Sequence, residues 1–415
     1  MKTLKIDGGN ILSGSVRISG AKNSVVALIP AAILSDEEVK ITNVPNISDV
    51  KSLENILKYL NVDFEKSKDE LIINSNNMEN KEIKRNMASK LRASYYFMGA
   101  LIGKYKHAEI CMPGGCTIGS RPIDLHLKGF RALGVNVEEK EDKIIMDAEE
   151  LNGSKIYLDF ASVGATINIM LAAVKANGKT IIENAAKEPE IVNIATFLNN
   201  MGAKIKGAGT DTIKIIGVKN LHSCSIEVIP DRIEAGTYLV MGAAIGESLK
   251  IENIIPQHIS TVIEKLEEMG VKIEVGDDYA IVSKPKKLKA TTIKTLVYPG
   301  FPTDLQQIMA SLMCIANGQS SIKENIYENR FNNLYELSKM GAKIEVNGLK
   351  AYIKGPTKLE ASEVNATDLR AGAGLVIAAL MAEGETIINN ADYILRGYED
   401  IVSKIKKLGG DITLI

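Results

Sequence analysis

The stretch KMGAKI at residues 339–344 has five counterparts along the chain, which read YLNVDF, ALGVNV, NMGAKI, EMGVKI and KLGGDI. Their third residues are Asn61, Gly134, Gly202, Gly270, Gly341 and Gly409, at intervals of 73, 68, 68, 71 and 68 residues. Each stretch ends a helical pattern and begins a strand pattern. Glycine and asparagine are the residues that most readily end a helix in the left-handed conformation. The spacing therefore predicts six related units.

A turn followed by a strand pattern recurs in the same units. It reads NGKTIIEN from Asn177, IGESLKIEN from Ile245, NGQSSIKEN from Asn317, EGETIINN from Glu383 and, less closely, SDEEVKITN from Ser35. The helices before these strands are apolar on most faces and rich in small residues, so we expect them to be buried. They are predicted at residues 23–34, 93–102, 165–174, 234–245, 305–316 and 369–382. The second helix of each unit, such as residues 261–269, is amphipathic and is expected to face solvent.

A single unit of about 70 residues cannot bury both faces of its own sheet, so the units must share buried helices. Six units can form one ring or two groups of three. A break is expected at residues 229–231, where Pro230 favours extended backbone. Strand patterns at residues 3–6 and 15–18 precede the first unit and can complete the other group.

The overall composition excludes several classes of protein. The chain has 415 residues with 50 basic and 51 acidic side chains, a formal net charge of −1, which does not favour nucleic acid or an anionic membrane as partner. No apolar run reaches the roughly 18–20 residues of a membrane span, and we expect a cytosolic protein. Its four cysteines and four histidines lack the spacing of a disulfide framework or a zinc site.

The arginines are few, and their positions carry information. Six of the nine lie in loops or first turns that open predicted helices: Arg92, Arg121, Arg232, Arg330, Arg370 and Arg396. A helix N-terminus attracts anions, and a guanidinium adds bidentate binding of carboxylate or phosphate. Each arginine taken singly is compatible with a surface ion pair. Six at comparable positions indicate a small polyanionic substrate.

Three further residues have both a functional and a structural interpretation. Lys22 opens the first buried helix beside Gly20, and it is either an anion ligand or a solvated lysine. Cys116 lies in the loop PGGCTIGSRP, where a nearby Arg121 would favour a reactive thiol, although most lone cysteines are incidental. Asp304 in PTDL is matched by Asp368 in ATDL, so both can be helix caps.

Taken together, these motifs resemble the enolpyruvyl transferases, and the resemblance runs from end to end of the chain. It is carried by SGAKNS at 19–24, PGGCTIGSRPIDLH at 113–126, SVGAT at 162–166, PDRIEAGT at 230–237, FPTDLQ at 301–306, ENRF at 328–331, ATDLRA at 366–371 and RGYE at 396–399. It implies an α/β fold of two domains, the inside-out α/β barrel, each with three βαβαββ-type repeats around buried helices. Residues 22–229 would form one domain and residues 1–21 with 230–415 the other, with the active site in the cleft between them.

The resemblance also implies a reaction. The enolpyruvyl group of phosphoenolpyruvate would move to the 3-hydroxyl of UDP-N-acetylglucosamine by addition and elimination, with release of phosphate, as the committed step of peptidoglycan synthesis. Cys116 would be the acid and the site of attack by fosfomycin, and Asp304 the base, with Lys22 and Arg396 also catalytic. Metal and organic cofactors are not implied. The partners would be the two small-molecule substrates, with no nucleic acid and no membrane, and the chain would be a monomer or weak oligomer.

Two sets of binding residues follow from the same resemblance. Phosphoenolpyruvate would contact Lys22, Asn23, Arg121, Arg330, Arg370 and Arg396, with Lys22, Arg121 and Arg396 at its phosphate and Arg330 and Arg370 at its carboxylate. UDP-N-acetylglucosamine would contact Asn23, Arg92, Arg121, Pro122, Ile123, Asp124, Leu125, Phe160, Ser162, Val163, Gly164, Asp304 and Ile326. Two rivals stay open: a transferase that acts on shikimate 3-phosphate, and a catalytically silent nucleotide-sugar sensor on the same scaffold.

Overall fold

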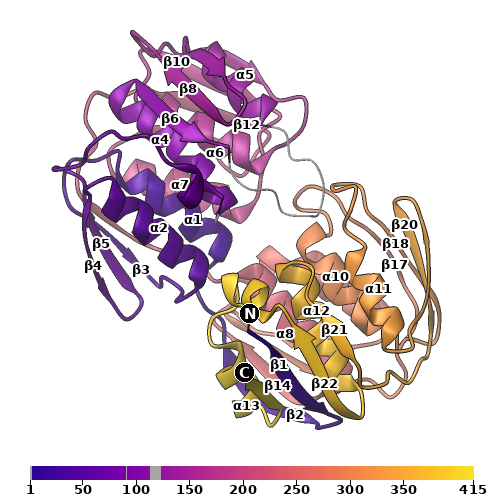
Figure 1. Cartoon of the computed structure of the whole chain (residues 1–415). Coiled ribbons are helices and arrows are strands. Elements are labelled where there is room, and N and C mark those ends of the chain that lie inside the picture. The colour runs from indigo at the N-terminus through magenta and orange to yellow at the C-terminus, as the bar shows by residue number, and fades with distance from the viewer. Residues whose placement is uncertain (1, 90, 113–122) are drawn as a thin grey trace. The chain divides into compact units, whose positions relative to one another are not determined.

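A computed structural model describes residues 2–89, 91–112 and 123–415 (Figure 1). These residues form two compact units. We call residues 20–112 with 123–229 the N-terminal unit, and residues 2–19 with 230–415 the C-terminal unit. In the described residues each unit contains three sheets. The predicted α/β fold, with six repeats in two groups of three, is therefore confirmed.

In the N-terminal unit the sheets have the strand orders β13-β3-β5-β4, β6-β8-β7 and β11-β12-β10-β9. Its helices are α1 (Lys22–Ala32), α2 (Ser48–Tyr59), α3 (Arg85–Ala88), η1 (Arg92–Tyr95), α4 (Tyr96–Tyr105), α5 (Asp124–Ala132), α6 (Val163–Ala173) and α7 (Pro189–Asn200). Its strands are β3 (Val39–Thr42), β4 (Asp63–Ser67), β5 (Glu70–Asn74), β6 (His107–Cys111), β7 (Asn136–Glu139), β8 (Lys143–Asp147), β9 (Lys155–Tyr157), β10 (Lys179–Glu183), β11 (Lys204–Lys206), β12 (Thr212–Ile216) and β13 (Cys224–Glu227).

In the C-terminal unit the strand orders are β15-β16-β14-β2, β17-β18-β20-β19 and β21-β22-β1-β23. Its helices are α8 (Arg232–Ile245), η2 (Pro256–Ile259), α9 (Ser260–Glu268), α10 (Thr303–Met313), α11 (Asn332–Lys339), α12 (Leu369–Met381), η3 (Ala391–Arg396) and α13 (Ile401–Lys407). Its strands are β1 (Leu4–Gly8), β2 (Leu12–Arg17), β14 (Gly246–Glu252), β15 (Lys272–Val275), β16 (Tyr279–Ser283), β17 (Thr292–Lys294), β18 (Gly318–Lys323), β19 (Lys343–Asn347), β20 (Lys350–Gly355), β21 (Glu363–Asn365), β22 (Gly384–Asn389) and β23 (Asp411–Leu414).

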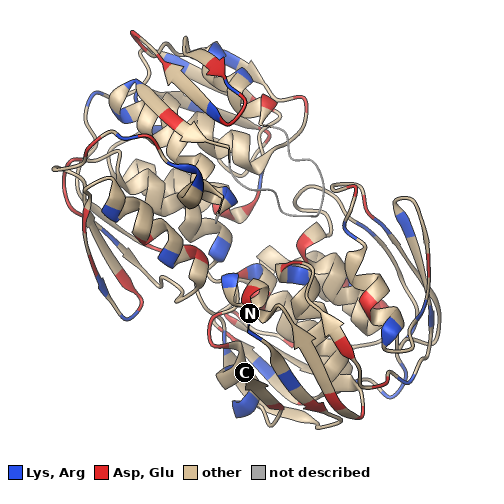
Figure 2. Ribbon diagram, in the orientation of Figure 1, with Lys and Arg blue, Asp and Glu red and all other residues tan. Residues whose placement is uncertain are grey.

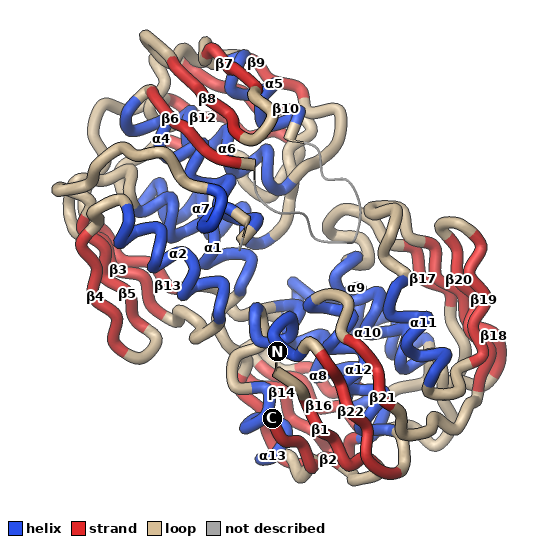
Figure 3. Tube along the Cα trace, in the orientation of Figure 1, coloured by secondary structure: helices blue, strands red, loops and turns tan. Residues whose placement is uncertain are grey.

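The first helix of each repeat is buried, as its apolar sequence predicts. In the C-terminal unit, helices α8, α10 and α12 pack on one another inside the three sheets (Figure 3). Every residue of α12 from Arg370 to Leu380 is buried. Small residues allow this close packing: a Cβ at Gly374 would stand 2.7 Å from the carbonyl oxygen of Gln307 on α10. The core of each unit is therefore helical, with the sheets outside.

The six helix-ending residues have the predicted conformation. Asn61 has φ +58°, and the glycines at positions 134, 202, 270, 341 and 409 have φ between +89° and +99°. The second helices are amphipathic as expected; α9, for example, buries Val262, Ile263 and Leu266 and exposes its three glutamates. The repeat pattern therefore predicts local backbone geometry as well as the number of units.

The N-terminal strands join the C-terminal sheets. β1 pairs antiparallel with β22 and β23, and β2 pairs parallel with β14. The chain thus enters the C-terminal unit, leaves it after residue 19 and returns at residue 230. Along the ribbon of each unit, Lys and Arg residues alternate with Asp and Glu residues and are not gathered by sign (Figure 2). Among the described residues, no helix is long and apolar enough to cross a membrane.

Candidate active site

The first turn of α10 carries a carboxylate between two buried arginines. Asp304 Oδ1 accepts a hydrogen bond from Arg330 Nη2 at 2.7 Å, and Asp304 Oδ2 lies 3.6 Å from Arg370 Nη2. The side chains of both arginines are 3% exposed, whereas that of Asp304 is 25% exposed. The carboxylate is therefore the part of this cluster that solvent or a ligand can reach.

Different elements position the two guanidinium groups. Arg330 lies in the loop between β18 and α11, where its Nη1 donates to Thr303 Oγ1 at 2.9 Å and its guanidinium lies 5.1 Å from the ring centroid of Tyr327. Arg370 is the second residue of α12 and lies 5.4 Å from the ring centroid of Tyr398. Aromatic rings stabilise desolvated arginine through cation–π attraction.

The arginines keep Asp304 ionised. Burial alone would raise the pKa of the Asp304 carboxyl, but the charges of Arg330 and Arg370 outweigh burial and hold that pKa well below its usual range. Burial lowers the pKa of both guanidinium groups, but Asp304 raises the pKa of Arg330 above its usual value, and Tyr398 followed by Asp304 does the same for Arg370. Asp304 is the partly exposed carboxylate beside the two buried cations, and the charges of Asp368 and Asp231 also act on Arg330 and Arg370, respectively. A second small carboxylate can enter on the exposed side of Asp304.

The matched motifs PTDL and ATDL differ in what their aspartates do. Asp368 is the N-cap of α12, and its Oδ1 accepts from the backbone N–H groups of Arg370 and Ala371. Asp304 is the second residue of α10, whose N-cap is Pro302, and its carboxylate accepts a hydrogen bond from Arg330 instead. The cap interpretation is correct for Asp368 and wrong for Asp304. A substitution at Asp304 should therefore act on charge, not on helix capping.

Two further arginines of the sequence prediction lie in the C-terminal unit. Arg232 is the first residue of α8, and its guanidinium lies 5.6 Å from the ring centroid of Tyr298. Arg396 ends η3 and precedes α13, so it lies before a helix without being part of its first turn. Ile326 is in the loop after β18, where its backbone N–H donates to Glu324 Oε1 at 2.8 Å.

In the N-terminal unit, Lys22 begins α1, and its Nζ lies 3.1 Å from Asp49 Oδ2. The Lys22 side chain is 14% exposed and that of Asp49 only 2% exposed. The interpretation of Lys22 as a solvated surface lysine is therefore wrong. Asn23 follows it in the first turn of α1, so both polar side chains are placed at the N-terminus of a buried helix.

A second cluster in this unit surrounds a buried histidine. His126 on α5 lies 6.0 Å from Tyr95 between ring centroids, and its Nδ1 lies 2.8 Å from Asn168 Nδ2. Burial, assisted by the positive charge of Arg92, lowers the pKa of His126 to about 3. The imidazole is therefore neutral, with Nδ1 as the acceptor for the Asn168 amide. A Cβ at Gly164 would stand 2.9 Å from His126 Cε1, so a larger residue requires this ring or α6 to shift.

The remaining residues predicted to contact the nucleotide sugar lie at the starts of α5 and α6. Ile123 and Asp124 precede and begin α5, with Leu125 next, and Ser162, Val163 and Gly164 begin α6. Ser162 caps α6, since its side chain accepts from Ala165 N–H at 3.3 Å. Phe160 is 47% exposed. The backbone N–H groups at the N-termini of α5 and α6 can bind an anion such as a diphosphate.

Three predicted site residues lie outside the described part of the chain: Cys116, Arg121 and Pro122. Their assigned roles stay predictions. Sequence reasoning missed Asp49, Thr303 and Tyr398. Tyr398 lies in the RGYE motif, so the sequence could have indicated it. Asp49 could not be found in this way, because its contact with Lys22 depends on how α1 and α2 pack.

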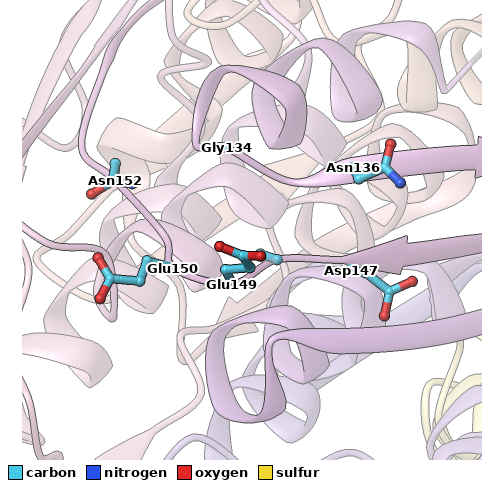
Figure 4. Close-up of a pocket in the computed structure, with 7 residues that line it drawn as sticks. Gly134, Asn136, Asp147, Glu149, Glu150 and Asn152 are labelled. Atoms are coloured by element: carbon cyan, nitrogen blue, oxygen red, sulfur yellow. The ribbon is translucent and has the colours of Figure 1, made fainter.

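One pocket lies away from these clusters, between the end of α5 and strands β7 and β8 (Figure 4). Asp147, Glu149 and Glu150 line it together with Gly134, Asn136, Ala148 and Asn152. Its acidic lining would repel phosphate and carboxylate groups. Among the described residues, no group of three or more His, Cys, Asp or Glu is arranged to hold a metal ion.

The chain is similar to known proteins over its whole length. A family model described as EPSP synthase (3-phosphoshikimate 1-carboxyvinyltransferase) matches residues 6–405. UDP-N-acetylglucosamine 1-carboxyvinyltransferase 2 from Bacillus anthracis is 53% identical over 414 residues, which cover 99% of this chain and 96% of that protein. Its counterpart from Listeria monocytogenes serotype 4b is 52% identical over 410 residues, 99% of this chain and 97% of that protein.

Solved structures agree with the sequence matches. The enolpyruvyl transferase NikO from Streptomyces tendae has a TM-score of 0.91 and 27% identity, covering 100% of this chain and 99% of that one. An EPSP synthase from Acinetobacter baumannii has a TM-score of 0.76 and 18% identity, with 100% of both chains covered. These matches confirm the resemblance inferred from the motifs: the chain belongs to the EPSP synthase family of enolpyruvyl transferases, in the group of the UDP-N-acetylglucosamine 1-carboxyvinyltransferases.

Proposed function

We propose that the protein transfers the enolpyruvyl group of phosphoenolpyruvate to the 3-hydroxyl of UDP-N-acetylglucosamine and releases phosphate, as the committed step of peptidoglycan synthesis. The observation that carries the proposal is the partly exposed Asp304 carboxylate between two buried arginines. Phosphoenolpyruvate supplies the second carboxylate that such a site can accept. The names of relatives that are 53% identical over 99% of the chain support the choice of acceptor.

The addition step requires one proton on the methylene carbon of phosphoenolpyruvate and one proton removed from the sugar hydroxyl. In this proposal Cys116 delivers the first proton and Asp304 removes the second. The hydroxyl oxygen then bonds to C2 and gives a tetrahedral intermediate. In the elimination step the new methyl group loses a proton as the C–O bond to phosphate breaks, and the enol ether is formed.

Asp304 can act as a base only if a second anion binds Arg330 and Arg370 and weakens their hold on its proton-accepting carboxylate. In the free protein, Arg330 and Arg370 stabilise the ionised carboxylate and make it a weak base. When the substrate carboxylate binds to these arginines, their positive charge is shared between two anions. The pKa of Asp304 then rises toward the range in which it can accept a proton. Binding of phosphoenolpyruvate thus activates the base.

The other contacts are assigned by the same proposal. Lys22, Arg121 and Arg396 bind the phosphate of phosphoenolpyruvate, and Asn23 lies with Lys22 at the start of α1. The N-termini of α5 and α6, with Arg92 and Ile326, bind the nucleotide sugar. We propose a cytoplasmic location and a monomer or weak oligomer.

Phosphate release with two acceptors tests the proposal. The protein is incubated with phosphoenolpyruvate and either UDP-N-acetylglucosamine or shikimate 3-phosphate, and free phosphate is measured. Release with the nucleotide sugar and none with shikimate 3-phosphate is expected. The opposite pattern would assign the chain to the shikimate reaction. Binding of the nucleotide sugar without any release would identify it as a silent sensor.

A further inference from the structure

A buried glutamate, Glu324, contacts Thr303, the neighbour of Asp304 in the chain. Glu324 directly follows β18, and its side chain is almost fully buried. Its Oε1 accepts from Thr295 Oγ1 at 2.7 Å, from Ile326 N–H at 2.8 Å and from Tyr327 N–H at 3.2 Å. Its Oε2 accepts from Thr303 Oγ1 at 2.9 Å. One carboxylate thus joins the end of β17, the start of α10 and the loop before α11.

In four other repeats, an asparagine directly follows the strand that corresponds to β18. The residues directly after β3, β10, β14 and β22 are Asn43, Asn184, Asn253 and Asn390, with φ between +55° and +60°. Three of these side chains donate to a backbone carbonyl at the end of the neighbouring parallel strand, as Asn253 does to Ile18.

After β18, Glu324 stands in place of the left-handed asparagine. Neither Glu324 nor Asn325 is among the described residues with positive φ. Asn325 makes the amide contact instead, donating to Thr295 O at 3.0 Å. The hydrogen bond from an asparagine amide to the neighbouring strand is thus kept by Asn325. Glu324 adds a carboxylate that the other repeats lack at this position. A departure from a repeated structural rule is expected where function requires it.

The contacts of Glu324 lead directly to the proposed base. Because the Thr303 hydroxyl donates to Glu324, its oxygen lone pairs are free to accept from Arg330 Nη1, at 2.9 Å. The other terminal nitrogen of Arg330 donates to Asp304 at 2.7 Å. Glu324 therefore fixes the direction of the Thr303 hydroxyl, and Thr303 fixes the guanidinium that holds Asp304.

We propose that Glu324 is a positioning residue for the enolpyruvyl transfer: through Thr303 it holds Arg330 against Asp304, and through two backbone N–H groups it holds the loop that carries Ile326. The inference rests on the proposed function for its kinetic consequences. Its geometric part concerns only residues of the C-terminal unit.

Two pairs of variants test this role. Glu324→Gln keeps the size of the side chain but turns an N–H group toward the Thr303 hydroxyl, which must then rotate and lose its orientation toward Arg330. Thr303→Val removes the hydroxyl and leaves Glu324 in place, whereas Thr303→Ser keeps the hydroxyl. Glu252→Gln is the control for Glu324→Gln, because Glu252 also directly precedes an asparagine in its repeat but is partly exposed and paired with Lys250.

The first readout is the titration of Asp304, which is monitored by NMR of protein whose aspartates carry carbon-13 at the carboxyl group. The Asp304 signal is assigned by its absence in Asp304→Asn. The charged groups that act on Asp304 are Arg330 from the loop after β18, Arg370 from α12 and Arg232 from α8. Loosening Arg330 removes part of the positive charge, so the titration should move to higher pH in Glu324→Gln and Thr303→Val. It should not move in Thr303→Ser or Glu252→Gln.

The second readout is kinetic. We expect kcat to fall about ten- to a hundredfold in Glu324→Gln and Thr303→Val, because small misplacement of reacting groups costs rates of this order. Glu252→Gln should stay within about twofold of the wild type, and Thr303→Ser, which keeps the hydroxyl, should lose less activity than Thr303→Val. If Glu324→Gln does not fold, the two Thr303 variants decide the question.

The outcomes separate this inference from the proposed function. A wild-type protein that releases no phosphate contradicts the proposed function, while the NMR comparison still decides what Glu324 does. An Asp304 titration that is unchanged in both Glu324→Gln and Thr303→Val overturns the positioning role, even if the wild type is active.

Discussion

Replacing Asp304 by asparagine removes the negative charge between two buried arginines and keeps the side-chain size. Loss of one partner of a buried ion pair costs about 3–5 kcal/mol, because the other charge stays buried without compensation. Asp304 is 25% exposed, so solvent moderates the loss, and asparagine can still accept one hydrogen bond from Arg330. We therefore expect the free energy of unfolding of the C-terminal unit to fall by about 2–3 kcal/mol.

The effect of this substitution depends on pH in a defined direction. The pKa of Asp304 is lower in the folded protein than the ordinary value of about 3.9, so its stabilisation is complete above that value. As the pH falls below about 4, the unfolded chain takes up the proton first and the stabilisation is lost. The stability difference between wild type and Asp304→Asn should therefore be largest at neutral pH and shrink toward pH 3.

The same substitution separates binding from turnover. Phosphoenolpyruvate no longer competes with Asp304 for Arg330 and Arg370, so its affinity in the presence of UDP-N-acetylglucosamine should rise. Loss of a general base should lower kcat by about 10²- to 10⁴-fold. Calorimetric titration measures the affinity, and phosphate release measures kcat.

Urea unfolding measures the stability change. It is followed by circular dichroism, since the chain has no tryptophan, and fitted with separate transitions for the two units. A free energy of unfolding that changes by less than about 0.5 kcal/mol at neutral pH, together with weaker binding of phosphoenolpyruvate, would contradict this role of Asp304. In that case Asp304 would not be the counter-ion of the two arginines.

Three other perturbations have defined outcomes. Cys116→Ser should abolish covalent labelling by fosfomycin, measured by mass spectrometry, and labelling that persists would exclude this thiol. The His126 imidazole should stay neutral in NMR titrations until the pH approaches about 3, while protonation near pH 6.5 would contradict its burial beside Arg92. Gly164→Ala should displace that ring and weaken binding of UDP-N-acetylglucosamine in calorimetry; a variant that binds like wild type would show that α6 accommodates the methyl group.

Much of the fold could be predicted because a weak local pattern, a helix that ends in glycine or asparagine, recurs six times. One glycine after a helical pattern says little, but six such residues at intervals near 70 define the units, and all six have positive φ. The buried helices were predictable for a related reason: small apolar residues on every side leave no polar face for solvent. Pairing of β1 with β22 and β23 connects the two ends of the chain, and local patterns do not specify it.

The site was less predictable because equal motifs need not have equal roles. PTDL and ATDL have the same pattern, but only Asp368 caps its helix, while Asp304 faces arginines from two other elements. That difference depends on tertiary packing. The burial of Lys22 against Asp49 likewise arises from the contact of α1 with α2.

Enolpyruvyl transfer by addition and elimination exchanges hydrogen with solvent, so the product formed in deuterium oxide reveals whether it occurs. Wild-type protein is incubated with phosphoenolpyruvate and UDP-N-acetylglucosamine in deuterium oxide, and the product is analysed by proton NMR and mass spectrometry. Addition places a solvent deuteron on the methylene carbon, and elimination removes one of the three hydrogens of the resulting methyl group. We therefore expect an enol ether at the sugar 3-oxygen with deuterium in its vinyl group. Absence of this ether, or an ether without deuterium in its vinyl group, would contradict it.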